Sequence, residues 1–290
     1  MRPRSKQEYG RRVHLLADHF GGVDPGTLSE AQVTEYFVFL IEVKKLAPAS
    51  IRQARAAIDL FFRAVVKVEW QVFSLIRTRG VAKLPVVLSR EEVQTLFATV
   101  KVPRFRLVLR LLYGCRLRIG EALALEVGDI RGRGPGFPTL LVRDGKGGKS
   151  RVVPLPQNLL AELRAWWATH RHARWIFPSP GSAWRANRRD TLDAQEAALA
   201  AQMHTATKPM STSRVQAVMR LAVAQSRINA CANLHTLRHS YATHLLEEGV
   251  HLRAISAYLG HTSLDTTMVY LHLTEPAEGT AHQALKRLFA

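Results

Sequence analysis

Apolar residues recur at helical spacing through most of the first 80 residues. The helices predicted from this spacing run from about Ser5 to Phe20, from near Ser29, from near Pro48, and from Glu69 to Arg77. In the third of them the apolar positions fall every three or four residues, at Ala54, Ile58, Phe61, Phe62 and Val65. The pattern therefore predicts an all-helical first segment.

A break in the apolar pattern follows this segment. Residues 78–86 contain Gly80 and Pro85, which interrupt helices, so the linker is expected here. Ser89 and Glu92 then have the spacing of a capping box, which marks the start of a helix in a second domain. The domain boundaries predicted from this break are a helical N-terminal domain at 1–80, a linker at 81–86 and a second domain at 87–290.

The second domain combines helices with one pair of short extended runs. Residues 140–142 and 151–153 are joined by a Gly-rich loop, which predicts a β-hairpin. A helix rich in Leu and Trp follows over residues 156–170, and the Ala-rich part of a long connection at residues 181–209 is compatible with an extra helix. The predicted fold class is mainly α with a small antiparallel β-sheet (α+β).

Ionisable residues recur inside apolar helices near the end of the chain. Leu237, Tyr241 and Leu245 form an i, i+4, i+8 stripe, so His235 and Arg238 are expected to project together from its edge. A cation and an imidazole are thus predicted side by side.

A second helix, from about residue 251 to 259, ends at Gly260, because glycine readily adopts the left-handed conformation that follows a helix C-terminus. His261 comes next. Tyr270 follows nine positions later, on another short predicted helix.

The His235-x-x-Arg238 pattern, the Leu-Gly-His run that ends at His261, and Tyr270 together resemble the signature of the tyrosine recombinase (phage integrase) family. The resemblance implies that Tyr270 attacks a DNA phosphodiester, forms a 3′-phosphotyrosyl link and releases a 5′-hydroxyl. It also implies a core-binding, SAM-like domain at residues 1–80, which clamps DNA together with a catalytic domain, and a catalytic Arg and Lys upstream.

Two upstream motifs match those remaining positions. Residues 112–121, Leu-Tyr-Gly-Cys-Arg-Leu-Arg-Ile-Gly-Glu, resemble the family's first Arg box, with Arg118 in the catalytic place and Glu121 in the acidic position after it. Arg116 stands where many members have Gly, and the sequence leaves open whether it adds a cation near the site or faces solvent. The family's catalytic Lys maps to Lys146 in the Gly-rich loop.

The chemistry explains these residue types. Attack on a phosphodiester places negative charge on the non-bridging oxygens, which guanidinium groups such as Arg118 and Arg238 stabilise, with His261 as a further donor. We expect His235 to help ionise the tyrosine together with the two arginines, and the ammonium of Lys146 to protonate the leaving 5′-oxygen. Because the phosphotyrosyl link keeps the bond energy, neither ATP nor a metal is needed, and no cofactor is expected.

The charge composition indicates which kind of partner the protein binds. The 290 residues include 41 Lys and Arg against 23 Asp and Glu, a net charge of +18, which concentrates polyanions and favours double-stranded DNA. No apolar run approaches the roughly 18 residues that span a bilayer, so no membrane association and a cytoplasmic location are expected. Cys115 and Cys231 are too few for a disulfide framework and are expected in the core.

Other functions fit these residues less well. The Gly-Lys-Ser run at 148–150 resembles a phosphate-binding loop, but Arg143 stands where that motif needs Gly. His235 and His239, at i, i+4, suggest a metal-binding module, but they lack the intervening Glu of a zincin, and Arg238 would repel a cation. The alternatives that remain are a type IB topoisomerase and a non-catalytic DNA-binding protein.

The last residues carry a narrow apolar stripe, formed by Ala281, Ala284, Leu285 and Leu288. The helix predicted to carry this stripe is too short to be stable alone. The family resemblance implies a homotetramer on two recombining sites, in which this tail docks on a neighbouring protomer. Docking on the tail's own domain is the alternative.

Overall fold

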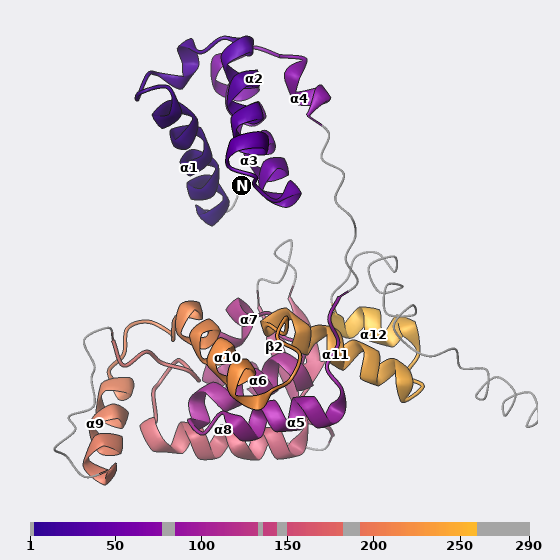
Figure 1. The fold of residues 1–290 in the computed structure, drawn as a ribbon. Coiled ribbons are helices and arrows are strands. Elements are labelled where there is room, and N and C mark those ends of the chain that lie inside the picture. The colour runs from indigo at the N-terminus through magenta and orange to yellow at the C-terminus, as the bar shows by residue number, and fades with distance from the viewer. Residues whose placement is uncertain (1–2, 77–84, 133–135, 144–149, 182–191, 260–290) are drawn as a thin grey trace, which may run out of the picture. The chain divides into compact units, whose positions relative to one another are not determined.

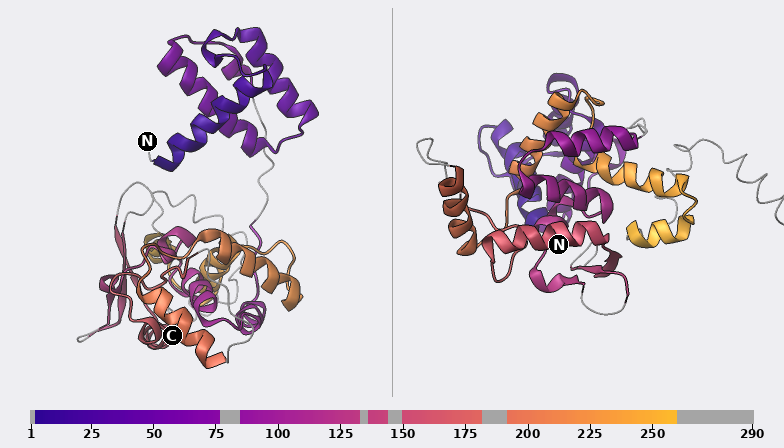
Figure 2. Two further views of the ribbon diagram at one scale, coloured as in Figure 1. Left: turned by 90° about the vertical axis from the view of Figure 1, so that its left-hand side faces the viewer. Right: turned by 90° about the horizontal axis from the view of Figure 1, so that it is seen from below.

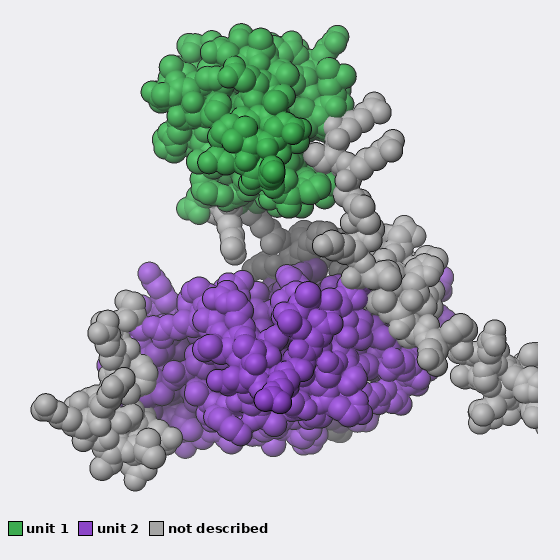
Figure 3. Space-filling view, in the orientation of Figure 1, with its two compact units in different colours: residues 1–83 green, residues 84–290 purple. Residues whose placement is uncertain are grey.

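The computed structural model describes residues 3–76, 85–132, 136–143, 150–181 and 192–259. The chain folds into two compact units, residues 1–83 and residues 84–290, which are coloured separately in Figure 3. Each unit buries a hydrophobic core of its own.

Unit 1 is all-helical, as its apolar spacing predicts (Figure 1). Its elements are α1 (Pro3–His19), the 3-10 helix η1 (Pro25–Thr27), α2 (Glu30–Val38), the π-helical turn η2 (Phe39–Val43), α3 (Pro48–Phe61), the π-helical turn η3 (Phe62–Val66) and α4 (Val72–Leu75). The core lies between these helices and is rich in aromatic residues, including Tyr36, Phe37, Phe62 and Phe73.

The helix predicted from Glu69 to Arg77 is much shorter in the structure, where α4 spans only Val72–Leu75. A contact from another helix sets its start, because Oε1 of Glu30 accepts a hydrogen bond from the main-chain N–H of Val72 (2.8 Å). Its end follows from the backbone of Ile76, which has a non-helical ψ of 84°.

Unit 2 is mainly α with one small sheet, which confirms the predicted fold class (Figures 1 and 2). Its helices are α5 (Arg90–Thr99), α6 (Pro103–Gly114), α7 (Ile119–Leu123), the 3-10 helix η4 (Val127–Asp129), α8 (Gln157–His170), α9 (Leu192–His204), α10 (Thr212–Ser226), α11 (Leu234–Glu247) and α12 (Leu252–Leu259). The capping box predicted at the start of α5 is present: the side chain of Ser89 accepts from the N–H of Glu92, and Glu92 accepts from Ser89.

Helix α6 lies at the centre of unit 2. It is apolar on most of its faces, and six of its residues are buried: Phe105, Leu107, Val108, Leu109, Leu111 and Leu112. A helix with this pattern needs neighbours on all sides. Helices α5, α7, α8, α10 and α11 all contact it, so α7 and α11, which carry residues of the candidate site, share one buried neighbour.

The sheet contains three antiparallel strands in the order β1-β2-β3: β1 (Ile130–Arg131), β2 (Thr139–Val142) and β3 (Arg151–Pro154). The predicted hairpin is confirmed, with Val142 paired to Arg151 next to the loop and Thr139 paired to Pro154 at the other end. Leu140 and Val142 are buried on the face that packs on the core, as the period of a strand requires.

The Ala-rich part of residues 181–209 forms α9, an extra helix attached to α8. Met203 of α9 is buried, and Nδ1 of His204 is hydrogen-bonded to the carbonyl oxygen of His170 (3.0 Å). Cys115 is buried as expected, but Cys231 is exposed, because it lies in the turn between α10 and α11.

Candidate active site

Arg118 occupies the N-terminal cap of α7. Its main-chain N–H donates to Oε2 of Glu121 (2.8 Å), and its Nη1 donates to Oε1 of the same carboxylate (2.8 Å). These two bonds fix both the start of α7 and the direction of the guanidinium. Since the side chain remains 31% exposed, Arg118 presents a charged group to solvent from a fixed point.

Arg238 lies on α11 and is 7% exposed. Its Nη1 donates a 2.5 Å hydrogen bond to the carbonyl oxygen of Arg116. Arg116 belongs to the turn between α6 and α7, two residues before Arg118. The structure therefore brings together two motifs that lie 120 residues apart in the sequence.

Side-chain hydrogen bonds hold α11 in place on the scaffold. Oγ of Ser240 accepts from the main-chain N–H of Leu88 (2.9 Å), and the hydroxyl of Tyr113 on α6 is hydrogen-bonded to Nδ1 of His244 (2.8 Å). Buried polar groups of this kind are costly unless they are paired, so they favour one position of the helix. The position of Arg238 follows from that of α11.

His235 lies in the first turn of α11 and is exposed. Its main-chain N–H donates to Oδ1 of Asn233, the N-cap residue (2.9 Å), so the helix start is fixed beside it. Arg238, three positions later, is buried. Helix α11 thus places His235 on its exposed side and Arg238 on its buried side, one turn apart.

Arg116 does not face solvent, because it is fully buried. Its guanidinium lies 5.9 Å from the ring centre of Tyr241, and its backbone has a φ of 49°. This left-handed conformation costs a non-glycine residue about 1 to 2 kcal/mol, so the position suits glycine better. Burial lowers the pKa of His239 to about 4, and the charges of Arg116, His235 and Arg238 contribute in that order.

Sequence reasoning missed the second partner of Glu121. Arg151, the first residue of β3, donates from Nη1 to Oε1 (3.1 Å) and from Nη2 to Oε2 (2.8 Å) of that carboxylate. Burial raises the pKa of Glu121, but the hydrogen bonds from Arg151 and Arg118 outweigh it and hold the pKa at about 2. An arginine at the first position of a predicted strand was the signal in the sequence, but it did not identify the partner.

The other predicted site residues, Lys146, His261 and Tyr270, lie outside the described residues. The segments before them are described. Arg143, which follows β2, makes ion pairs with Asp129 (2.6 Å) and Glu126 (3.2 Å). Helix α12 spans Leu252–Leu259, and the helix end predicted at Gly260 lies outside the described residues.

Within the described ranges, no group of three His, Cys, Asp or Glu side chains is arranged to hold a metal ion. His235 and His239 share α11, but the depressed pKa of His239 reflects burial and then the nearby cations Arg116 and Arg238, which would also repel a metal. Of the helices in those ranges, none combines the length and the apolar character needed to cross a membrane.

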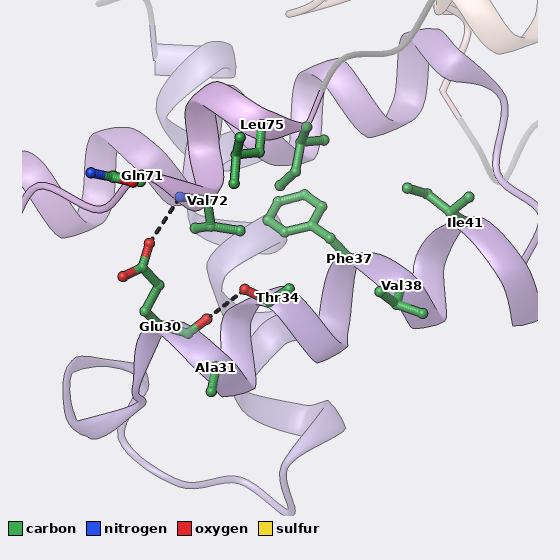
Figure 4. Close-up of a pocket in the computed structure, with 10 residues that line it drawn as sticks. Glu30, Ala31, Thr34, Phe37, Val38, Ile41, Gln71, Val72 and Leu75 are labelled. Atoms are coloured by element: carbon green, nitrogen blue, oxygen red, sulfur yellow. Dashed lines mark hydrogen bonds between the residues drawn. The ribbon is translucent and has the colours of Figure 1, made fainter.

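The groove between α2 and α4 in unit 1 has a volume of about 550 Å³ and is mostly apolar (Figure 4). Phe37, Val38, Ile41 and Leu75 are among the side chains that line it. Its carboxylate, Glu30, is engaged in the hydrogen bond that caps α4. The groove therefore lacks the convergent ionisable groups that phosphoryl chemistry requires.

Comparisons with known proteins agree with the two units. Residues 86–276 match the model of the phage integrase family, and residues 1–72 match that of the phage integrase N-terminal SAM-like domain. A putative integrase/recombinase, y4qK, of Sinorhizobium fredii is 35% identical over 91% of this chain and 77% of its own length. The tyrosine recombinase XerD of Caulobacter vibrioides is 29% identical over 88% of this chain and 80% of its own length.

The fold is also that of solved recombinases. The structure of the XerH site-specific recombinase bound to a palindromic difH substrate matches with a TM-score of 0.65 and 18% identity, covering 98% of this chain and 80% of that one. This chain thus combines a SAM-like helical unit with a second helical unit that contains a three-stranded sheet. The second unit also holds the two arginine motifs, which meet at Arg116. This chain belongs to the phage integrase family of tyrosine recombinases.

Proposed function

We propose that this site-specific DNA recombinase cleaves a DNA strand by attack of the hydroxyl of Tyr270 on a phosphodiester. The P–O bond to the 5′-oxygen breaks, a 3′-phosphotyrosyl link forms, and a 5′-hydroxyl is released. Attack by a 5′-hydroxyl from a second strand reverses the step and joins the two. Because the covalent link conserves the bond energy, the reaction needs neither ATP nor a metal.

The observation that supports this proposal best is the 2.5 Å hydrogen bond from Arg238 to the carbonyl of Arg116. It attaches α11 to the turn that leads into Arg118, so two guanidinium-bearing segments meet. Two fixed cations suit the charge that grows on the non-bridging oxygens of a phosphate under attack. Their charge also favours the phenolate of a nearby tyrosine, which at neutral pH otherwise costs about 4 kcal/mol to form.

The remaining roles rest on the motif positions. We assign His235 to the ionisation of Tyr270, His261 to a further hydrogen bond to the phosphate, and Lys146 to protonation of the leaving 5′-oxygen. The exposed position of His235 at the start of α11 suits a group that must reach a substrate.

The partner that we infer is double-stranded DNA. The net charge of +18 supports it, and so does the XerH relative, whose structure is of a complex with its difH substrate. We infer that residues 1–80 form the core-binding domain, that 81–86 link it to the catalytic domain at 87–290, and that the two clamp the duplex. A homotetramer on two sites, formed by exchange of the C-terminal tail, and action in the cytoplasm complete the proposal.

A covalent-trapping experiment tests the proposed nucleophile. On a nicked suicide substrate the protein should form an adduct that survives a denaturing gel, and Tyr270→Phe should abolish it while duplex binding stays nearly unchanged. Tyr9→Phe, which removes a hydroxyl from unit 1, is the control and should form the adduct. An adduct that persists in Tyr270→Phe would contradict the assignment, and binding without any adduct would favour a non-catalytic DNA-binding protein.

A further inference from the structure

We propose that Arg151 is a positioning residue for Arg118 and acts on it through Glu121. The inference rests on the proposed function, because it assigns Arg118 to the reacting phosphate. It starts from one carboxylate that two arginines share: Glu121 accepts two hydrogen bonds from Arg118 and two from Arg151.

The two arginines use Glu121 differently. Arg151 donates to the carboxylate from both terminal nitrogens, one to each oxygen. Arg118 donates once from Nη1 of its guanidinium and once from its main-chain N–H. The side chain of Arg151 is 13% exposed and that of Arg118 is 31% exposed. The bidentate, more buried partner is therefore Arg151, and the more accessible one is the arginine of the catalytic motif.

The charges explain why this arrangement helps catalysis. The low pKa of Glu121 keeps its carboxylate ionised at neutral pH. One negative charge shared by two guanidinium groups leaves a net positive charge at the start of α7. Without Arg151, the same carboxylate would have only Arg118 to pair with, so it would neutralise this cation and draw its donors away from a phosphate.

The positions of the elements add a second consequence. Arg151 starts β3, whereas Arg118 and Glu121 belong to the cap and first turn of α7. The shared carboxylate thus fixes the edge of the sheet to the helix that carries Arg118. A lysine at 151 would keep the charge but would lose the planar fork that holds both oxygens.

Single-turnover cleavage of a suicide substrate at saturating DNA tests this inference. Arg151→Gln should lower the cleavage rate by about 10- to 100-fold, by analogy with the loss seen when a partner that orients a metal ligand is removed. Affinity for a half-site duplex should change less than threefold, because Arg151 is not assigned to DNA. Arg151→Lys should fall between the wild type and Arg151→Gln.

The decisive variant is the double substitution Arg151→Gln with Glu121→Gln. It removes the carboxylate that would neutralise Arg118, so it should cleave faster than Arg151→Gln alone. Because neutralising a buried carboxylate also restores stability, the two variants are compared at equal folded fraction, measured by circular dichroism, where a purely structural role of Arg151 predicts equal rates. Arg110→Gln is the matched control, because it breaks another arginine–glutamate pair of unit 2, Arg110 with Glu162 (2.6 Å), that does not involve Glu121. It should cleave at the wild-type rate.

The outcomes separate this inference from the proposed function. If the wild type forms no adduct that depends on Tyr270, the proposed function fails. If the wild type cleaves, the inference is overturned by a folded Arg151→Gln that cleaves equally fast, by a rate loss fully explained by DNA affinity, or by a double variant no faster than Arg151→Gln. If Arg151→Gln does not fold, Arg151→Lys decides, and a wild-type rate in that variant overturns the inference.

Discussion

The 2.5 Å hydrogen bond from Nη1 of Arg238 to the carbonyl oxygen of Arg116 is where α11 meets the turn between α6 and α7. It uses one donor of a guanidinium that carries five. A planar guanidinium can hold such a bond and also offer a bidentate pair of N–H groups to a phosphate. The ammonium of a lysine lacks this planar fork, so it cannot hold the carbonyl oxygen and also offer a bidentate pair of donors to a phosphate.

Arg238→Lys should consequently lower cleavage far more than binding. We expect the single-turnover rate to fall on the order of 10²- to 10³-fold, as when one donor to a developing oxyanion is removed, with half-site affinity nearly unchanged. Arg220→Lys, at an exposed position on α10, is the control. A variant Arg238→Lys that cleaves within threefold of wild type would exclude this role for the guanidinium.

Arg116→Gly should raise the pKa of His239. The charge of Arg116 is the second cause, after burial, of the depression of that pKa to about 4, so its removal should move the pKa upward while burial keeps it below its ordinary value of 6.5. Arg227→Gly is the matched control, because Arg227 also has a positive φ (55°) but is exposed at the end of α10. Histidine titration by NMR measures the pKa of His239 in both variants. An unchanged value in Arg116→Gly would show that the charge of Arg116 does not lower this pKa.

The helices, the hairpin and the capping box at Ser89 could be predicted from the sequence because each depends on residues within a few positions of one another. Long-range polar contacts could not. Periodicity places Arg151 on a strand and Glu121 on a helix, but it does not say that the two meet. The short α4 has the same cause, because Glu30, 42 positions away, caps it.

The candidate site likewise has parts that local sequence patterns predict and parts that depend on long-range packing. Motif spacing identified Arg118, His235 and Arg238 in the sequence. It did not predict the hydrogen bond by which α11 is attached to the turn at Arg116, because that contact depends on how the helices pack. Arg116 itself showed the limit of local reasoning, because a charged residue in an Arg-rich motif gave no sign of complete burial. The roles of Lys146, His261 and Tyr270 stay predictions from the motifs.

Unit 2 should lose stability as the pH falls from about 6.5 to 4. Burial, and then the charge of His172, lowers the pKa of His170 to about 4. The folded state thus binds fewer protons than the unfolded state in this window, so its full stability is present above pH 6.5 and is lost on acidification at up to about 1 kcal/mol per pH unit. The free energy of unfolding, measured with urea at several pH values, should fall less steeply with decreasing pH in His170→Gln than in the wild type. His14→Gln, at an exposed position, is the control, and equal slopes in both variants would contradict this origin.

Lys146→Ala should slow cleavage much more on a normal substrate than on one with a 5′-bridging phosphorothiolate. A thiolate leaves without a proton, so the sulfur substrate bypasses the need for a general acid. Lys149→Ala, in the same loop, is the matched variant and should lose activity equally on both substrates. If Lys149→Ala shows the selective loss instead, the general acid is Lys149.

Deletion of residues 280–290 should uncouple protomers without preventing one protomer from binding a half-site. The tail carries Ala281, Ala284, Leu285 and Leu288 on one predicted face, and a helix of this length is marginal in water unless its apolar side is covered. If a neighbouring protomer covers it, the truncated protein should fill a full site with less cooperativity than the intact chain, and its cleavage should change.

A gel-shift titration on half-site and full-site duplexes separates the two ways of covering the tail. Leu285→Ala with Leu288→Ala removes most of the apolar face but keeps the length of the chain, so it should reproduce the loss of cooperativity. Lys286→Ala with Arg287→Ala keeps that face and removes only charge, so cooperativity should remain while overall affinity falls through the loss of phosphate attraction. If the leucine variant instead fills both half-sites like the intact protein but has a lower Tm, the tail packs on its own domain and exchange between protomers is wrong.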